Sequence, residues 1–376
     1  FANRTKTFVF DPVADRFNAR SDPDFFLQNN AKPLFLDEIQ YAPELLASIK
    51  RDVDKHKEPG MYILSGSQNL SVLKNISESL AGRVSIQNLL PMSVSEQYPR
   101  ETNSFLSYWI SKSADVSQKE LDTQKFALTP PESLLRCIWR GGYPGLLDMP
   151  DSLVSNYFQS YIQTYIERDV RSVSDIKALG TFSQFFGLLA ALTSSEINQS
   201  QLGRELGVDQ KTALQWLTVA EATYQWIKVP AFSRNPVKRI SGKPKGYFTD
   251  TGLACFLQKI MSPEVIMSHP FLGRLMETFI VMEIKKLTSA WTMEPSLYHY
   301  RSHGGGEVDL IMDINGILFP IEIKAKTNPS GKDCRGFDSF RKTFPAEKIG
   351  TNLIVCSIEQ PMFIRKATMA VPWWVL

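Results

Sequence analysis

The sequence predicts an α/β protein of several domains, and three observations lead to this prediction. Two short apolar runs, 34–36 and 61–64, flank a stretch with helical spacing, which indicates a strand, a helix and a strand of one parallel sheet. A long helical region follows between 97 and 180. Nearer the C-terminus, Asn315-Gly316 joins two further apolar runs as a tight hairpin, which indicates a second sheet.

Composition limits the kinds of protein that this chain can be. With 376 residues, 43% of them hydrophobic and 22% charged, it is an ordinary soluble globular protein. A net charge of +3 gives little steering, so any affinity for nucleic acid must come from a local patch. Four cysteines without paired spacing argue against a zinc site and a disulfide framework, and they favour a reducing cytoplasm. The sequence has no run of about 18 apolar residues, which predicts no membrane insertion.

The N-terminal part is organised around residues 34–40, Leu-Phe-Leu-Asp-Glu-Ile-Gln. The three apolar residues predict a strand buried on both faces, which delivers Asp37 and Glu38 to its carboxyl end, where open α/β sheets bind ligands. This is Walker B geometry: the first acid, Asp37, would hold the Mg²⁺ on ATP, and Glu38 would orient the attacking water. The alternative is a buried strand that ends in a polar turn.

The second strand, 61–64, ends in Ser65-Gly66-Ser67-Gln68 beside the first strand end. Ser67, or with less weight Ser65, is therefore placed to contact a γ-phosphate or the attacking water. No G-x-x-x-x-G-K-[ST] occurs in the sequence, and the apolar run at 7–10 has no helix or turn before it. Two explanations stay open: this chain lacks its true N-terminus with the phosphate-binding loop, or the protein has lost nucleotide binding.

Residues 181–250 have the pattern of a winged helix. The expected elements are a short helix at 201–206, a turn at 207–209, a longer helix at 211–226 with Leu214, Leu217 and Ala220 inward, and a basic hairpin at 228–245. The hairpin holds six Lys or Arg residues and no acid, so it is a candidate for DNA phosphates. The four candidate contacts are Lys238, Arg239, Lys243 and Lys245. The outward face of the longer helix has no arginine for a guanine edge, so a structural or protein-contact module is the alternative.

The Asn315-Gly316 turn fixes the register of the C-terminal hairpin, because partners across a two-residue turn sum to a constant. Asp309 should therefore lie opposite Glu322, and Lys324 should share their face. Opposed carboxylates repel each other unless a cation lies between them. A cation between two such carboxylates is what a divalent-metal nuclease requires, and a helix expected at 271–288 presents a further acid, Glu277.

Two observations support a different interpretation of that hairpin. Glu307 should face Lys324, which would make an ordinary cross-strand ion pair. Pro320 inside the second strand would force a bulge and shift the register. His299, His303 and the Gly304–Gly306 turn either admit a phosphate backbone or form a flexible turn.

Several motifs in order resemble the prokaryotic AAA-superfamily ATPases that carry a C-terminal domain of unknown function with a restriction-endonuclease-like end. They cover nearly the whole chain and begin at Leu34 (LFLDEIQ), Pro43 (PELL), Leu64 (LSGS), Ser79 (SLAGR), Gly141 (GGYP), Tyr165 (YIERD), Asp250 (DTGL) and Glu307 (EVDL). The resemblance implies a P-loop upstream of Phe1, ATP and Mg²⁺ as cofactors, and Arg83 near the nucleotide. The alternative for Arg83 is an exposed arginine at a helix end beside Gly82.

The set Glu277, Asp309 and Glu322-x-Lys324 likewise resembles the PD-(D/E)xK nuclease core. The three acids would hold Mg²⁺, and Lys324 would stabilise the hydroxide or the charge that develops on the phosphorus. Folds of this kind also occur as binding scaffolds, so cleavage is one of two outcomes.

We therefore expect a truncated P-loop, AAA-type parallel sheet at 1–96, a helical lid or connector at 97–180, a winged helix at 181–250 and a restriction-endonuclease-like α/β domain at 251–376. The expected function is ATP binding and hydrolysis coupled to movement of the C-terminal modules on DNA or on a protein partner. The alternatives are a Mg²⁺-dependent DNA nuclease with a regulatory ATPase part, and a non-catalytic scaffold. The oligomeric state stays open.

Overall fold

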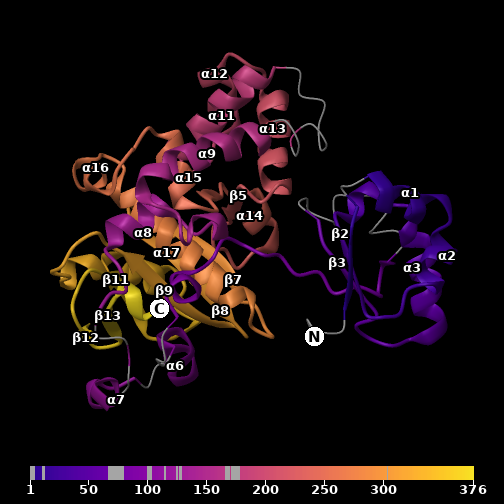
Figure 1. Ribbon diagram of the computed structural model, residues 1–376. Coiled ribbons are helices and arrows are strands. Elements are labelled where there is room, and N and C mark those ends of the chain that lie inside the picture. The colour runs from indigo at the N-terminus through magenta and orange to yellow at the C-terminus, as the bar shows by residue number, and fades with distance from the viewer. Residues whose placement is uncertain are drawn as a thin grey trace. The chain divides into compact units, whose positions relative to one another are not determined.

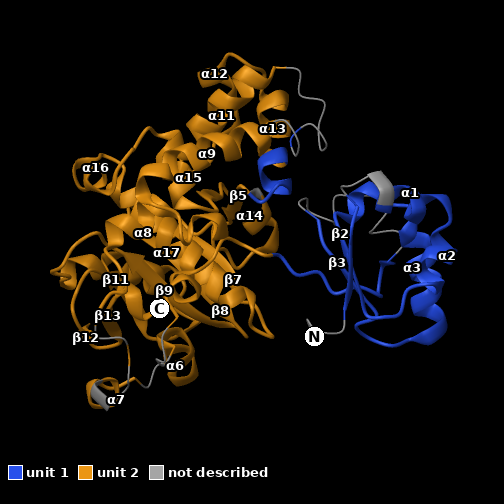
Figure 2. Ribbon diagram, viewed as in Figure 1, with its two compact units in different colours: residues 1–88, 168–175, 219–224 blue, residues 89–167, 176–218, 225–376 orange. Residues whose placement is uncertain are grey.

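The computed structural model describes residues 5–10, 13–66, 80–99, 104–113, 116–123, 126, 129–165, 170, 178–302 and 304–376. The chain divides into two compact units (Figure 2). The first comprises residues 1–88, 168–175 and 219–224; the second comprises residues 89–167, 176–218 and 225–376. The finer division into four domains stays a prediction.

The first unit contains a parallel sheet in the order β1-β2-β3, with helices in the connections (Figure 1). Its elements are β1 (Lys6–Val9), α1 (Val13–Ser21), α2 (Pro23–Gln28), β2 (Leu34–Asp37), η1 (Ile39–Tyr41), α3 (Leu45–His56) and β3 (Tyr62–Leu64). The predicted strand, helix and strand are confirmed, because β2 and β3 pair in parallel and α3 connects them.

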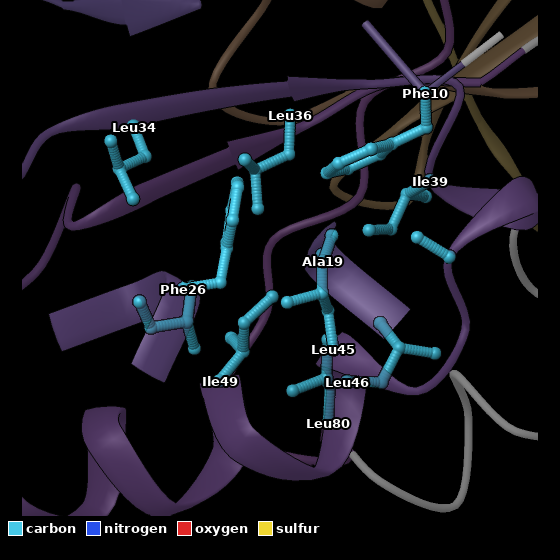
Figure 3. Packing of buried hydrophobic residues seen from close by; sticks show 12 residues of the cluster. Phe10, Ala19, Phe26, Leu34, Leu36, Ile39, Leu45, Leu46, Ile49 and Leu80 are labelled. Carbon is cyan, nitrogen blue, oxygen red and sulfur yellow. The ribbon is translucent and has the colours of Figure 1, made fainter. Parts of the chain in front are cut away.

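Helices α1, α2 and α3 pack their apolar side chains against the same face of the sheet (Figure 3). Leu34 and Leu36 of β2 are fully buried in this core, whereas Phe35 between them is only half-buried. The prediction that both faces of this strand are buried is therefore corrected. The physical reason is that side chains alternate along a strand. Leu34 and Leu36 point to the face that all three helices cover, and Phe35 points to the other face.

The second unit begins with helices, as the sequence predicted for 97–180. They are α5 (Val94–Gln97), α6 (Phe105–Lys112), α7 (Gln118–Thr123), α8 (Leu134–Arg140), η2 (Pro144–Leu146), α9 (Asp151–Tyr165) and α11 (Leu179–Ala191). On α9 the rings of Tyr157, Tyr161 and Tyr165 stack at centroid distances of 6.4 and 6.1 Å, and Tyr165 is buried, so this stripe is a packing surface. Within the described part of the chain, no helix has the length and apolar character needed to cross a bilayer.

Two of the sequence motifs, Gly141–Pro144 and Asp250–Leu253, pack against each other and form a joint between α8 and α15 (Thr251–Leu257). Asp250 caps the N-terminus of α15: its Oδ1 accepts from Leu253 N at 2.9 Å and its Oδ2 accepts from Gly142 N at 2.7 Å. A Cβ on Gly141 would lie 2.3 Å from Asp250 Oδ1, and a Cβ on Gly142 would lie 2.3 Å from the Met92 carbonyl oxygen. The backbone approaches so closely here that only glycine fits at either position.

Residues 195–248 form a helical pair with a small antiparallel sheet in the order β4-β6-β5, and all but residues 219–224 of this stretch belong to the second unit. Its elements are β4 (Ser195–Glu196), α12 (Gln199–Leu206), α13 (Gln210–Ala222), β5 (Trp226–Val229), α14 (Pro236–Ser241) and β6 (Lys245–Phe248). The short helix, the turn and the basic hairpin follow the prediction, and the hairpin contains the unpredicted helix α14. The winged-helix assignment itself stays a prediction.

Two details of the prediction for α13 are corrected. The helix ends at Ala222 and not at Trp226, because Tyr224 adopts a left-handed conformation with φ of 58° and Trp226 begins β5. Leu214 was expected to face inward, but it is 39% exposed, whereas Leu217 is fully buried.

The C-terminal part of the second unit is a mixed sheet in the order β12-β13-β11-β9-β8-β7, with β10 on β9 (Figure 1). The remaining elements are α16 (Pro263–Ser268), α17 (Leu272–Ser289), β7 (Ser296–Arg301), β8 (Glu307–Ile314), β9 (Ile317–Ile323), η4 (Gly331–Cys334), α18 (Arg335–Thr343), β10 (Lys348–Ile349), β11 (Asn352–Cys356), β12 (Met362–Arg365), β13 (Thr368–Pro372) and η5 (Trp373–Val375).

The β8–β9 hairpin has the predicted turn and register. Asn315 and Gly316 both have positive φ, 53° and 78°, as a type I′ turn requires. Pairing runs without a shift from Ile314–Ile317 to Leu310–Ile321. Pro320 pairs opposite Ile311 within this regular ladder, so the bulge that it was expected to force as the alternative is absent between these two strands.

Candidate functional site

The carboxyl ends of β2 and β3 bring Asp37 and Ser65 into contact. Leu36 and Leu64 are register partners, so the residues that follow them leave the sheet side by side. Ser65 Oγ donates to Asp37 Oδ1 at 2.5 Å, and Glu38 N donates to the same oxygen at 3.0 Å. The structure thus assembles Asp37 with Ser65, the serine that received less weight in the sequence, whereas Ser67 lies outside the described residues.

Glu38 ends β2 in an uncommon backbone conformation. Its φ of 55° and ψ of 46° lie in the left-handed region, which side-chain-bearing residues adopt at a cost of roughly 1 kcal/mol or more. Its Oε2 accepts a hydrogen bond from Gln40 Nε2 at 2.5 Å. The chain therefore turns sharply where β2 ends, and the catalytic role of Glu38 stays a prediction.

Arg83 contacts α3 of the same unit. Its Nε and Nη2 donate to the two carboxylate oxygens of Asp54, at 2.5 and 3.0 Å, and these bonds hold the pKa of Asp54 below its ordinary value. Arg83 also lines a groove of about 660 Å³ beside β3. This is the geometry of a surface arginine after Gly82, and the nucleotide contact implied by the family resemblance stays a prediction.

A second cluster of charges surrounds Lys245 in the C-terminal unit. Its Nζ lies 2.9 Å from Glu277 Oε1, 2.8 Å from Glu307 Oε1 and 3.8 Å from Asp309 Oδ1. Tyr247, two residues along β6, donates its hydroxyl to the same Glu277 oxygen at 2.8 Å. Strand β6, helix α17 and strand β8 therefore meet at one buried polar centre.

Asp309 and Glu322 lie at the same centre and are each 7% exposed. Asp309 Oδ2 accepts from Ile323 N at 2.8 Å, and Lys324 Nζ pairs with Glu322 Oε1 at 2.5 Å. The expected pair between Glu307 and Lys324 is corrected, because Glu307 pairs with Lys245 instead. The other oxygen of Glu322, Oε2, is buried and has no hydrogen-bond partner among the described residues.

Burial and mutual repulsion keep protons on several of these acids. Burial, and then repulsion by Asp309, raise the pKa of Glu277 to about 7 and that of Glu322 to about 8. Burial also raises the pKa of Asp309. Burial opposes the charged form of Lys245, but Glu277, Asp309 and Glu307 raise its pKa above the ordinary value, so it stays an ammonium ion.

The predicted Mg²⁺ site at Glu277, Asp309 and Glu322 is not assembled in this conformation. No group of three or more His, Cys, Asp or Glu side chains is arranged to hold a metal ion in the part of the chain that the structure describes. The donor type fits a divalent cation, because four carboxyl groups meet here and Glu322 Oε2 has no hydrogen-bond partner among the described residues. The Lys245 ammonium lies within ion-pair distance of three of these four acids, Glu277, Glu307 and Asp309.

The basic hairpin, residues 228–245, contacts β7. Of its four candidate DNA contacts, some are buried or packed on aromatic rings. Lys245 is 2% exposed, so the prediction that it contacts DNA phosphates is corrected. The Arg239 guanidinium lies 5.4 Å from the ring of Phe232 and 5.2 Å from that of Tyr298. Lys243 is exposed, as a phosphate contact requires, and the side chain of Lys238 lies outside the description.

His299 joins β7 to this hairpin through its backbone and its ring. Its N donates to the Pro230 carbonyl at 3.0 Å, its carbonyl accepts from Phe232 N at 2.7 Å, and its Nε2 lies 3.0 Å from the Lys243 carbonyl oxygen. Burial lowers the pKa of this imidazole. The expectation of a phosphate contact at His299 is therefore replaced by a structural link, and His303 lies outside the described residues.

The sequence pointed to Glu277, Asp309, Glu322 and Lys324, but not to Lys245 as their partner. Lys245 and Tyr247 lie 32 and 30 residues before Glu277 and meet it only in the folded chain. The one local signal was their spacing of two along a strand, which places them on one face. Nothing in the sequence identifies the element that this face covers.

Replacing Glu322 with glutamine should remove part of the pH dependence of stability. The pKa of Glu322 is about 8 in the folded state against an ordinary 4.5, so the native protein keeps a proton that the unfolded chain has lost. Stability should therefore fall as pH rises from about 4.5 to about 8, by on the order of 1–3 kcal/mol for this residue. Urea unfolding at pH 5 and pH 8 should show a flatter profile for Glu322→Gln, and an unchanged profile would show that Glu322 ionises as it does in the unfolded chain.

Three families match successive parts of the chain. Residues 2–98 match a family described as an AAA domain, which confirms the AAA-superfamily resemblance of the N-terminal part. Residues 131–264 match a domain of unknown function, DUF8612, and residues 272–376 match another, DUF4143. The winged-helix and nuclease-like assignments stay predictions.

The chain is also similar to two curated proteins, both uncharacterized. They are Mb2031c of Mycobacterium bovis and Rv2008c of Mycobacterium tuberculosis, each 26% identical over 313 residues, which is 82% of this chain and 62% of the relative. The chain thus spans less than two thirds of their length. The crystal structure of protein VC1899 from Vibrio cholerae matches over 98% of this chain and 87% of its own, with 11% identity and a TM-score of 0.19, which is too low for an argument.

Proposed function

We propose that this protein binds and hydrolyses ATP with Mg²⁺ in its N-terminal unit and couples hydrolysis to its C-terminal modules. The observation that carries the proposal is the contact between Asp37 Oδ1 and Ser65 Oγ, at 2.5 Å, at adjoining carboxyl ends of a parallel sheet. Ligands of open α/β sheets bind at this edge. The match of residues 2–98 to an AAA domain supports the same conclusion.

Each residue at these strand ends has a distinct role in the proposal. Asp37 holds the hydrated Mg²⁺ of the nucleotide, and Ser65 keeps the Asp37 carboxylate oriented through its hydrogen bond. Glu38 polarises the attacking water, and Ser67 contacts the γ-phosphate. Arg83 approaches the nucleotide only if it leaves Asp54, with which it is paired.

The C-terminal modules are, in this proposal, a winged helix and a PD-(D/E)xK-like domain that act on DNA or on a protein partner. The order of α11, β4, α12, α13, β5 and β6, with the sheet order β4-β6-β5, supports the winged helix. Lys243 is exposed on its hairpin and is its best candidate for a phosphate contact. Four free and buried cysteines agree with a reducing compartment.

Asp37→Asn tests the proposal through nucleotide binding. The sequence has no G-x-x-x-x-G-K-[ST], so the measurement uses a chain extended upstream of Phe1 to include a phosphate-binding loop. Loss of the Asp37 charge should remove the part of ATP affinity that depends on Mg²⁺, roughly tenfold or more, as measured by calorimetry with and without EDTA. Asp24→Asn, at an exposed aspartate of α2, is the matched control. Equal Mg²⁺ dependence in both variants would remove Asp37 from the site.

A second candidate function is metal-dependent cleavage of a phosphodiester by the C-terminal sheet. The observation that favours it is the buried, unpartnered Oε2 of Glu322 beside Asp309, with Lys324 on the same strand end. Glu277, Asp309 and Glu322 would hold a divalent cation, which would activate water and polarise the phosphate. Lys324 would hold its proton and stabilise negative charge on the phosphate oxygens.

A further inference from the structure

We propose that Lys245 is a tethered cation that keeps the carboxylate cluster of the C-terminal unit closed to divalent metals. The inference rests on the second candidate function, because it concerns the occupancy of the same cluster. Lys245 Nζ lies within ion-pair distance of Glu277, Glu307 and Asp309, at 2.9, 2.8 and 3.8 Å. A metal bound by these oxygens would lie within about 3 Å of the ammonium, so repulsion allows only one of the two cations.

The ammonium is held in the cluster by the fold around it. Lys245 is 2% exposed, and it belongs to β6, which is the central strand of its sheet. Tyr247 on the same strand donates to Glu277, so two side chains of β6 attach to one carboxylate of α17. Two residues earlier, the carbonyl oxygen of Lys243 lies 3.0 Å from Nε2 of His299 on β7. Burial of Lys245 and the contacts of its neighbours thus hold the strand segment that carries the ammonium.

Lys245 is one of two ammonium groups in the cluster. Glu277, Glu307, Asp309 and Glu322 supply four carboxyl groups, and Lys245 and Lys324 supply two ammonium ions. Without Lys245 the four carboxyl groups keep Lys324 as their one described ammonium partner, and Glu322 Oε2 already has no hydrogen-bond partner among the described residues. Removing the lysine thus creates the electrostatic conditions for a divalent cation.

Lys245→Met tests this inference, because methionine replaces the buried stem of the lysine and removes only the charge. Melting curves of the whole chain are recorded with EDTA and with Mn²⁺. The parent should not respond to Mn²⁺, whereas the variant should be less stable than the parent in EDTA and gain about 5 °C when Mn²⁺ exceeds its Kd a hundredfold. Lys243→Met, at an exposed lysine two residues away, is the control and should behave as the parent.

Two further variants complete the experiment. Adding Asp309→Asn to Lys245→Met should abolish the gain from Mn²⁺, since Asp309 would be one of the ligands. If Lys245→Met alone does not fold, the charge-balanced pair Lys245→Met and Glu277→Gln takes its place, and Mn²⁺ should stabilise it through Glu307, Asp309 and Glu322.

The outcomes separate the inference from the candidate function beneath it. Stabilisation of the parent by Mn²⁺ to the same degree as the variant would overturn the role of Lys245 and leave the metal site standing. If Mn²⁺ changes the melting temperature of no variant, both the exclusion of metal by Lys245 and the metal site itself are overturned.

Discussion

Glu38→Gln should leave ATP binding intact and abolish most ATP hydrolysis in a chain that includes a phosphate-binding loop. The amide has the size of the carboxylate but cannot polarise water, and Asp37 stays free to hold Mg²⁺. We expect a loss of roughly a hundredfold or more in kcat, which corresponds to about 3 kcal/mol of transition-state stabilisation. Single-turnover hydrolysis and equilibrium binding of ATP measure the two effects separately.

The control for this variant is Gln40→Glu, because Gln40 Nε2 donates to Glu38 Oε2 at 2.5 Å. A second carboxylate beside Glu38 should weaken hydrolysis less than loss of Glu38 itself, since the carboxylate of Glu38 is retained. Hydrolysis that proceeds at the parent rate in Glu38→Gln would remove Glu38 from catalysis. Loss of ATP binding in the same variant would show instead that the residue supports the strand end.

Asp250→Ala should be among the most destabilising single changes in the second unit. Asp250 is 1% exposed, and its carboxylate accepts hydrogen bonds from Gly142 N and Leu253 N, so alanine leaves two buried donors unpaired and a cavity. We expect a loss of about 3 kcal/mol of unfolding free energy, and urea denaturation of the whole chain measures it.

Asp250→Asn is the matched variant, because the amide oxygen still accepts one of the two hydrogen bonds. Its loss should be smaller than that of Asp250→Ala. Equal stability of the alanine variant and the parent would show that the joint between the Gly141–Pro144 and Asp250–Leu253 motifs contributes nothing to the fold.

The N-terminal half of the fold was predictable because its determinants are local. Apolar runs at 34–36 and 61–64 became β2 and β3, and the helical spacing between them became α3 (Leu45–His56). The same local pattern predicted that Phe35 is buried, but it is only half-buried. How many faces of the sheet are covered depends on where α1, α2 and α3 pack, and the apolar run does not encode this. The sequence also predicted an α13 that continues past Ala222. The left-handed backbone of Tyr224 ends the helix there, and a tyrosine side chain gives no reliable sign of that conformation.

For the strand ends, the sequence indicated the right place and less reliably the right partner. Asp37 lies at the end of β2 as expected. Among the described residues, the serine that donates a hydrogen bond to it is Ser65. Ser65 follows the last paired residue of β3 directly, and the parallel pairing of Leu64 with Leu36 places it beside Asp37. Parallel pairing therefore decided a question that composition left open.

Local sequence patterns were enough to predict the α/β class, the acidic end of β2 and the register of the β8–β9 hairpin, because each depends on residues that are near one another in the chain. Only the tertiary structure decided that Lys245, expected on a DNA-binding surface, is buried among Glu277, Glu307 and Asp309. The physical reason is that a lone lysine is as compatible with solvent as with an ion pair. Its environment depends on which distant carboxylates the fold brings to β6, and burial then makes their pairing necessary.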